Sequence, residues 1–273
     1  MTSPTHAGRG HQCWSFADRA EFVARAGRFL AGGLESGQRV CYIGSGGVPA
    51  LTAQLRGVGG FDDAVDSGAA QVVALDGLYP SDRVLDPVAQ VQVYAAATRA
   101  ALAAGYRGLR VAADATDLVR GPARLAAFAR YEHLADRYMA GHPFEGMCAF
   151  DRAALHPDDL ARLACLHPDG HPTPFRLHAR TRAGDFALDG EVDGLTRDLL
   201  PWALEHALPG VERDGELVVD ATGLRFIDHR GLLTIAEHAT RGGRTAVLRT
   251  RWSGAARIAA ILTIPGMRVE VVA

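Results

Sequence analysis

The chain has 273 residues, which is long for one ordinary domain and suits two. Its composition, 48% hydrophobic and 22% charged, is that of a globular protein with a substantial buried core. All 29 basic residues are arginine, which excludes a Schiff-base lysine, a lysine general base and the lysine of a Walker A loop. The net charge of −2 argues against nucleic acid held by bulk electrostatics, so we expect no direct nucleic-acid partner.

The first ten residues are polar, so no signal peptide is expected. No window of the sequence approaches the roughly 18 consecutive apolar residues of a membrane span. The four cysteines, which form no C-x-x-C pair, are Cys13, Cys41, Cys148 and Cys165. Widely spaced cysteines without an export signal are typical of reduced thiols. We therefore expect a cytoplasmic protein without a membrane partner.

Strands and helices alternate through the first part of the chain. Short apolar runs predict strands at 39–43, 71–75, 109–113 and 146–150. Apolar spacing predicts a helix between the cap Asp18 and the stop at Gly33. The same spacing predicts further helices at 49–55, 86–104 and 122–139 and from 157. This alternation favours a mostly parallel sheet with helices on both faces.

The clearest break lies between 166 and 184, because three prolines and a glycine fall within residues 167–174. After it, the sequence predicts a hairpin of two strands, 175–179 and 185–189. Further strands are predicted at 217–220, 245–248 and 268–272, and helices near 195–208, from 229 and near 253–263. The chain is therefore predicted to form two α/β domains.

A glycine-rich loop, Gly44-Ser45-Gly46-Gly47, separates a predicted strand from a predicted helix. Backbone N–H groups in such a loop can bind an anion, so Ser45, Gly46 and Gly47 are candidate ligand-binding residues. The G-x-x-x-x-G-K-[ST] pattern is missing, which argues against nucleotide hydrolysis. The alternative is a tight turn that binds no ligand.

Other candidate ligand residues lie outside that loop. His11 and Cys13 are two residues apart in a segment expected to be extended, so both face one side and could bind a metal or a reactive small molecule. Cys148 could join them in redox or metal sensing. Burial in the core is the alternative for all three residues.

Two acidic residues complete the candidate ligand set. Asp114 follows the end of a predicted strand, where open α/β sheets contact ligands, although capping explains an acid there equally well. Glu132 lies in the middle of a predicted helix. No metal site is assigned, because the metal-like spacing of Cys165, His167 and His171 falls in the proline-rich segment.

Residues 217–232, LVVDATGLRFIDHRGL, form the most informative segment. An apolar strand ends in Asp220, Phe226 and Ile227 return to the core, and Asp228 caps a helix that begins at His229. The segment resembles the hallmark of STAS domains, the anti-sigma-factor-antagonist module. Segments 188–193 and 241–244 resemble the same family, and the resemblance covers 175–273.

The STAS resemblance implies a protein partner, either an anti-sigma factor or a related kinase-fold regulator. The residues implied to bind it are Asp228, His229, Arg230, Gly231, Leu232 and Leu233. The family carries a phosphorylated serine as the second of a Ser-Ser pair, and Arg230 occupies that position here. Because arginine cannot accept the phosphate, something else must gate the interaction.

The first part of the chain resembles the MEDS domain, a sensory module with RecA/KaiC-like α/β character. The resemblance covers 9–168 and rests on the short segments 11–13, 33–34, 40–43, 108–111, 131–132, 147–151 and 166–168. Phe150 replaces the tyrosine that is usual in the family. The resemblance implies a domain that senses a ligand or a redox change.

Together these observations predict an α/β protein with a RecA/KaiC-like MEDS domain at 9–168, a linker at 169–182 and a small STAS domain at 175–273. We expect a signalling regulator and not an enzyme, in which the sensory domain gates partner binding by the STAS domain. The alternative is a nucleotide-binding RecA-like protein with little or no hydrolysis. The ligand is a small molecule or a nucleotide, no cofactor is identified, and a homodimer is one open option.

Overall fold

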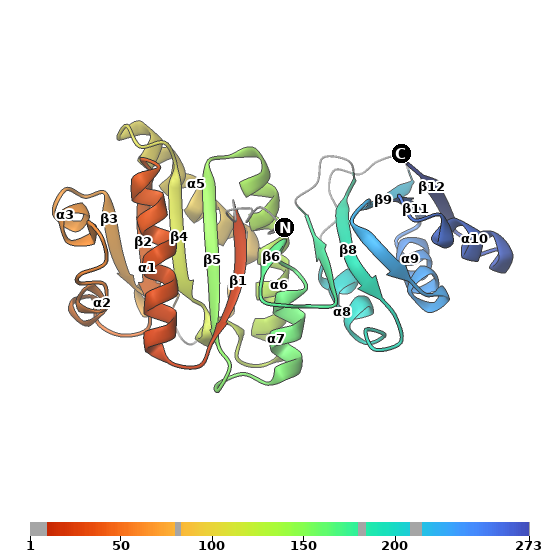
Figure 1. Cartoon of the computed structure of the whole chain (residues 1–273), viewed down its shortest axis with the longest axis horizontal. Helices are drawn as coiled ribbons and strands as arrows, with labels where there is room; N and C mark the ends of the chain where they lie inside the picture. Colours follow the sequence, from red (N-terminus) through yellow and green to blue (C-terminus); the bar gives the residue numbers. More distant parts are fainter. Residues whose placement is uncertain (1–9, 80–82, 180–183, 208–214, 273) are drawn as a thin grey trace, which may run out of the picture. The chain divides into compact units, whose positions relative to one another are not determined.

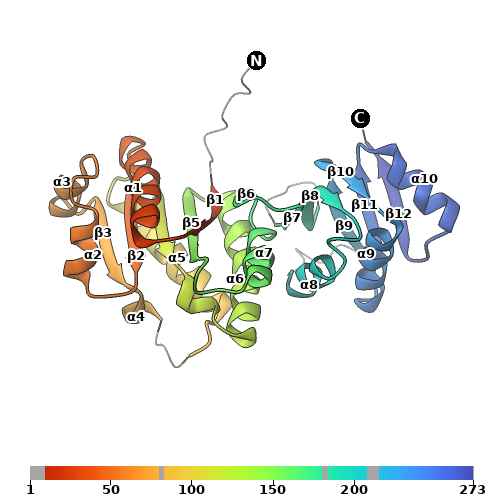
Figure 2. The same ribbon diagram turned by 60° about the horizontal axis from the view of Figure 1, so that its bottom comes forward.

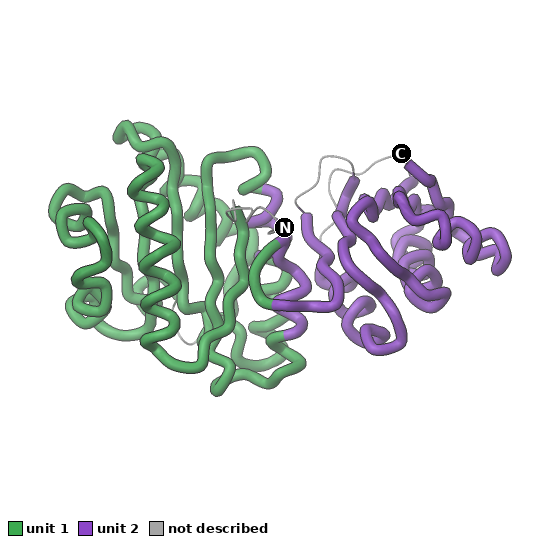
Figure 3. Tube along the Cα trace, in the orientation of Figure 1, with its two compact units in different colours: residues 1–131, 138–160, 169–171 green, residues 132–137, 161–168, 172–273 purple. Residues whose placement is uncertain are grey.

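The computed structural model describes residues 10–79, 83–179, 184–207 and 215–272. The chain forms two compact units (Figure 3). Unit 1 comprises 1–131, 138–160 and 169–171, and unit 2 comprises 132–137, 161–168 and 172–273. The domain boundaries drawn from the sequence, 9–168 and 175–273, stay predictions. Of the predicted linker, residues 180–182 lie outside the described ranges, as do residue 9, residue 208 of a predicted helix, and residue 273.

Unit 1 is built on a parallel sheet (Figure 1). Over the described residues its strand order is β3-β2-β4-β5-β1-β6, and every pairing is parallel. The strands are β1 (His11–Phe16), β2 (Arg39–Gly44), β3 (Ala70–Ala74), β4 (Leu109–Asp114), β5 (Phe144–Asp151) and β6 (Asp169–Gly170). The predicted mostly parallel α/β sheet is confirmed.

Helices lie on both faces of this sheet. They are α1 (Arg19–Glu35), α2 (Val48–Gln54), α3 (Phe61–Asp66), α4 (Leu75–Leu78), α5 (Pro87–Ala103), α6 (Pro122–Gly141) and α7 (Pro157–Ala164), with a 3-10 turn η1 (Thr116–Val119). Helix α1 packs on β2 and β4 from one side, and α5 lies on the opposite side (Figures 1 and 2). Asp18 caps α1 as predicted, because its carboxylate accepts the Glu21 N–H at 2.9 Å.

Apolar side chains from α1 and the central strands form the core of unit 1. The Phe22 ring lies between the rings of Phe16 and Tyr42 in contact order. Its centroid is 5.1 Å from that of Phe16, at a tilt, and 5.6 Å from that of Tyr42, on which it stacks. Burial raises the pKa of Tyr42 to about 12, so its hydroxyl stays protonated and donates to Gln54 at 2.9 Å. The short helices α3 and α4 were not predicted, because six and four residues are too few to show a helical period.

The strand order creates a switch point between β2 and β4. From β2 the chain runs through α2 and α3 to β3 on one side, and from β4 it runs through η1 and α6 to β5 on the other. The two connections therefore diverge at the carboxyl ends of neighbouring strands. In open α/β sheets this is where ligands bind.

Unit 2 has a mixed sheet of its own. Its strands follow the order β10-β8-β9-β11-β12, and β7 pairs antiparallel with β8 to form the predicted hairpin. The strands are β7 (Phe175–His178), β8 (Phe186–Val192), β9 (Glu216–Ala221), β10 (Leu224–Ile227), β11 (Thr245–Thr250) and β12 (Met267–Val271). The helices are α8 (Leu199–His206), α9 (His229–Arg241) and α10 (Ser253–Leu262).

One prediction for unit 2 is wrong in part. Ile227 is fully buried, but Phe226 is 40% exposed and contacts the Trp252 ring with centroids 5.4 Å apart. Both residues belong to β10, which is an edge strand, and neighbouring residues of a strand point to opposite faces. Only one of the two could therefore enter the core.

None of the helices in the described ranges combines the length and the apolar character that a membrane crossing requires.

Candidate functional site

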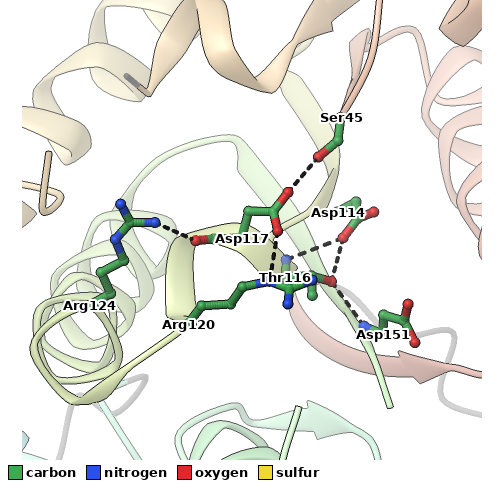
Figure 4. Close-up of polar contacts among 7 residues, drawn as sticks. All are labelled: Ser45, Asp114, Thr116, Asp117, Arg120, Arg124 and Asp151. Carbon is green, nitrogen blue, oxygen red and sulfur yellow. Dashed lines mark hydrogen bonds and ion pairs between the residues drawn. The ribbon is translucent and has the colours of Figure 1, made fainter. Parts of the chain in front are cut away.

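The connections after β2 and β4 meet at Asp117 in η1 (Figure 4). The Ser45 hydroxyl donates to one oxygen of Asp117 at 3.0 Å, and Arg120 Nε donates to the other at 2.9 Å. Arg124 Nη1 donates to the Asp117 backbone carbonyl at 3.1 Å. Ser45 from the predicted glycine-rich loop is thereby held at the switch point, next to two arginines.

Asp114, at the end of β4, connects three segments of the same edge. Its Oδ1 accepts from the Thr116 N–H and hydroxyl at 3.2 and 2.6 Å, and its Oδ2 lies 3.0 Å from Arg19 Nη1 at the start of α1. The Thr116 hydroxyl oxygen in turn accepts the Asp151 N–H at 2.9 Å, which brings in the end of β5 (Figure 4). With 4% of its surface exposed, Asp114 holds the edge together, as a capping acid does.

Gly46 and Gly47 lie in the exposed part of the loop that leads to α2. Gly46 has φ +115°, a conformation that favours glycine, and no heavy atom lies within 4 Å of the position of an added Cβ. Open space therefore lies above the loop. Helix α2 is only seven residues long, so the loop rather than the helix would have to hold an anion.

A pocket of about 510 Å³ lies beside Asp117. Its walls come from α4, the segment before α5, the first turns of α5, η1 and the start of α6. The lining residues are Leu75, Asp76, Leu78, Tyr79, Arg83, Val84, Leu85, Asp86, Ala89, Gln90, Val93, Asp117, Leu118, Arg120 and Arg124. Its volume falls in the range of small-molecule sites. None of these residues is predicted as a site residue from the sequence, although Asp117 follows Asp114 closely in the chain.

His11, Cys13 and Cys148 lie on neighbouring strands of unit 1. Cys13 on β1 is the register partner of Cys148 on β5, and a ring nitrogen of His11 lies within 4.8 Å of the Cys148 sulfur. All three are buried, and neither cysteine forms a disulfide with another described residue. The structure thus brings these predicted residues together, at a place inside the sheet and not at its carboxyl edge.

Glu132 lies on α6 in a part of the chain that belongs to unit 2. It is fully buried, and its Oε2 lies 3.3 Å from His167 Nε2. His167 Nδ1 lies 2.8 Å from the Leu163 carbonyl, to which it donates. The carboxylate and the imidazole therefore form a buried pair within unit 2.

Unit 2 also holds buried polar residues that the sequence does not single out. His178 lies 3.7 Å from Asp136 through Nδ1 and 3.0 Å from Asp189 through Nε2. Burial lowers the pKa of His178, but hydrogen bonds to these two carboxylates outweigh it and raise the pKa above its usual value. Burial lowers the pKa of nearby His133 to about 3, so this ring, which packs edge-on against Phe186, stays neutral. Apolar periodicity gives no signal for such a cluster.

The start of α9 has the geometry that the sequence predicts. Asp228 caps the helix, because its carboxylate accepts the Gly231 N–H at 2.8 Å. His229 and Arg230 are exposed and Leu233 is half-buried, whereas Gly231 and Leu232 lie in the core. Two of the six residues implied to bind a partner, Gly231 and Leu232, therefore lie beneath the surface and support it.

Apolar side chains flank this helix start. His229 lines a shallow pocket of about 380 Å³ together with Ile258, Ile261 and Leu262 of α10. Ile261 is 81% exposed. A second open pocket of about 850 Å³ runs along α9 between Leu233 and Arg241. Exposed apolar groups bordered by polar residues are typical of protein-binding surfaces.

Comparison with known families gives a match over the part of the chain that contains the carboxyl edge and its pocket. Residues 10–168 match the family described as MEDS, the MEthanogen/methylotroph, DcmR Sensory domain. No curated protein matches the chain.

Proposed function

Because the chain belongs to the family of the MEDS sensory domain, we propose that it is a cytoplasmic signalling regulator whose first unit senses a ligand and whose second unit binds a protein partner. The proposed partner is an anti-sigma factor or a related kinase-fold regulator. The proposal assigns binding, and not catalysis, to both units. It rests on the sensory family in the first unit and on the STAS-like segment 217–232 in the second.

One observation carries the partner-binding part. At the start of α9 the exposed His229 lines a pocket together with exposed apolar side chains of α10, among them Ile261, and the exposed Arg230 follows it in the chain. Interfaces are enriched in arginine, and patches of exposed apolar residues mark protein-binding sites. Arg230 takes the place of the serine whose phosphorylation adds negative charge in STAS proteins, so this chain carries a permanent positive charge there.

Gating then requires a ligand that prefers one state of the protein. A ligand that binds one state of the first unit more tightly shifts the population toward that state, and with it the exposure of the α9 start. The carboxyl edge between β2 and β4, with its pocket, is the place proposed for this ligand. The His11, Cys13 and Cys148 group supports a redox signal as the alternative, which an oxidation-insensitive protein would contradict.

The experiment is a pull-down of the host's kinase-fold anti-sigma factors by the full chain. The Arg230→Asp variant places negative charge where relatives carry phosphoserine, so we expect it to lose most of the captured partner. Arg28→Asp, the same charge change at an exposed position of α1, is the matched control and should capture as much as the wild type. Unchanged capture by Arg230→Asp would contradict the assigned surface.

A second candidate function is nucleotide binding at the Ser45–Gly47 loop. The open space above Gly46 and the position of Ser45 at the switch point favour it. A thermal-shift series with ATP, GTP and cyclic nucleotides tests it, because a ligand that binds the folded state raises the unfolding temperature. Stabilisation that Gly46→Val abolishes would favour this function, and no stabilisation by any nucleotide would exclude it.

A further inference from the structure

The pocket beside Asp117 has a large apolar wall. Leu78, Val84 and Val93 line it and are among the large hydrophobic residues that unit 1 leaves exposed. Val88, near the start of α5, is exposed as well but does not line the pocket. Isolated exposed hydrophobic residues are common, but a group of them around one concave site indicates a surface that an apolar molecule covers.

A buried polar group stands in the same wall. Gln90 of α5 lines the pocket with only 8% of its surface exposed, and its side-chain amide nitrogen has no hydrogen-bond partner among the described residues. A buried N–H group without an acceptor is costly, and native proteins leave few of them. Because this nitrogen is itself buried, an acceptor oxygen of a ligand would satisfy it once the side chain turns toward the pocket.

Arginines at the rim can bind an acidic group of a ligand. Three arginines, Arg83, Arg120 and Arg124, line the pocket together with three aspartates. Two of the aspartates already accept from the protein: Asp117 from Ser45 and Arg120, and Asp86 from two backbone N–H groups at the start of α5. Only one N–H group of Arg120 takes part in its contact with Asp117, and a guanidinium has five. Arg120 therefore keeps donors that can bind a ligand.

We propose that this pocket binds a small organic anion, with its apolar body against Leu78, Val84 and Val93 and its acidic oxygens toward Gln90 and the arginines. This inference rests on the proposed sensory function and names the chemical class of the sensed ligand. A carboxylate is the simplest member of the class, because arginine forks bind carboxylate oxygens in pairs.

Calorimetric titration of the full chain with octanoate tests the proposal, with octan-1-ol and butyrate as comparison probes. Octanoate has the acidic head and the apolar body, whereas octanol lacks the charge and butyrate lacks most of the body. We expect octanoate to bind at least about tenfold more tightly than either, because hydrogen bonds to charged groups and burial of methylene groups each contribute to its affinity.

Variants locate the site. The double variant Arg83→Gln with Arg120→Gln and the single variant Gln90→Leu should each weaken octanoate binding about tenfold, because each removes donors to the acidic head. Arg99→Gln and Gln92→Leu, at exposed positions of the same helix α5, are the matched controls and should bind as the wild type does. Circular dichroism melting confirms that the variants are folded.

Three results would overturn the proposal: no octanoate binding at millimolar concentration, equal binding of octanoate and octanol, or undiminished octanoate binding by the Arg83 and Gln90 variants. None of these results affects the measurement of partner capture through Arg230, which is made without octanoate. Conversely, failed partner capture leaves octanoate binding standing, so the two failures are distinguishable.

Discussion

The same three residues, Asp-Ala-Thr, end a parallel strand in each unit, and they lead to different surfaces. In unit 1 Asp114 Oδ1 accepts from the Thr116 N–H and hydroxyl at 3.2 and 2.6 Å. In unit 2 Asp220 Oδ1 accepts from the corresponding groups of Thr222 at 3.2 and 2.8 Å. The local turn is therefore the same in β4 and β9.

The segment after each turn makes the difference. After Thr116 the chain enters η1, where Asp117 receives Ser45 and the wall of a pocket begins. After Thr222 the chain passes Gly223 into the edge strand β10, and helix α9 starts only at His229. In unit 1 the result is a carboxyl edge with a pocket that has polar and apolar walls. In unit 2 it is an exposed helix start flanked by apolar side chains. The Asp-Ala-Thr turn thus fixes how each strand ends, but the segment that follows decides which surface forms there.

The largest expected effect is the difference in stability that the two turns lose when their aspartate is removed. Asp114→Ala removes the acceptor of Thr116 and the partner of Arg19 from a site that is 4% exposed. We expect it to cost about 2–4 kcal/mol of local stability, because buried groups lose their partners. Asp220→Ala, in a half-buried turn, should cost about 1 kcal/mol.

Native-state hydrogen exchange measures both losses, on peptides that cover β4 and β9 respectively. Equal losses at the two sites would show that the connections made by Asp114 beyond its own turn contribute nothing.

The second expected effect is acid sensitivity confined to unit 2. His133 has its pKa lowered from 6.5 to about 3 by burial, so below pH 6.5 the unfolded chain binds a proton that the folded state does not. Stability should fall by about 1.4 kcal/mol for each pH unit between pH 6 and pH 4 from this residue alone. His178 acts in the opposite sense: its raised pKa gives stability that is present at low pH and lost as the pH rises through that value.

Urea unfolding at a series of pH values isolates the His133 contribution. His133→Leu should flatten the acid limb of the stability profile, whereas His156→Leu, at an exposed histidine, should leave it unchanged. A His133→Leu profile parallel to that of the wild type would contradict the assigned pKa.

These effects bear on how far the sequence alone predicts the molecule. Periodicity and end signals predict most helices and strands. The predicted ends of β2 and β4 place Ser45 and Asp114 at the carboxyl edge of the sheet, where ligands bind in such folds. Local patterns do not reveal the pocket, because its walls come from the four-residue α4, from residues 83–86 and from one face of α5. Gln90 looks like any helical glutamine, and only tertiary packing buries it.

The same limit applies in unit 2. The cap at Asp228 follows from its position before a helix, but the burial of Gly231 depends on contact with another strand. An added Cβ at Gly231 would lie 2.8 Å from Val192 of β8. The resemblance to STAS domains placed Gly231 and Leu232 in the partner surface with the exposed residues of the same turn.

A smaller effect concerns the cap that presents Arg230. Asp228→Ala should cost about 1 kcal/mol, because the Gly231 N–H loses its acceptor. Asp198, which precedes α8 and makes no capping bond with its side chain, is the matched control, and Asp198→Ala should change the unfolding midpoint little. Equal shifts for the two variants in thermal unfolding would contradict the capping role.

The smallest effect is expected at the rim of the pocket in unit 1. Arg120 and Asp117 are both about half exposed, with side-chain exposures of 54% and 48%, so Arg120→Gln should lower stability by about 0.5 kcal/mol or less. Arg110→Gln breaks a pair with Glu145 whose members are 14% and 19% exposed, and it should cost more. The reverse order in urea unfolding would mean that Arg120 is a structural residue and not one available to a ligand.

The central claim is that the ligand binds at the carboxyl edge of unit 1 and the partner at the start of α9. The most direct test is hydrogen–deuterium exchange of the full chain, alone, with octanoate, and with the captured kinase-fold partner. The account predicts that octanoate protects peptides within 75–93 and 114–124, and that the partner protects peptides within 226–233 and 256–262. Partner protection at the carboxyl edge of unit 1, with none at the start of α9, would contradict it.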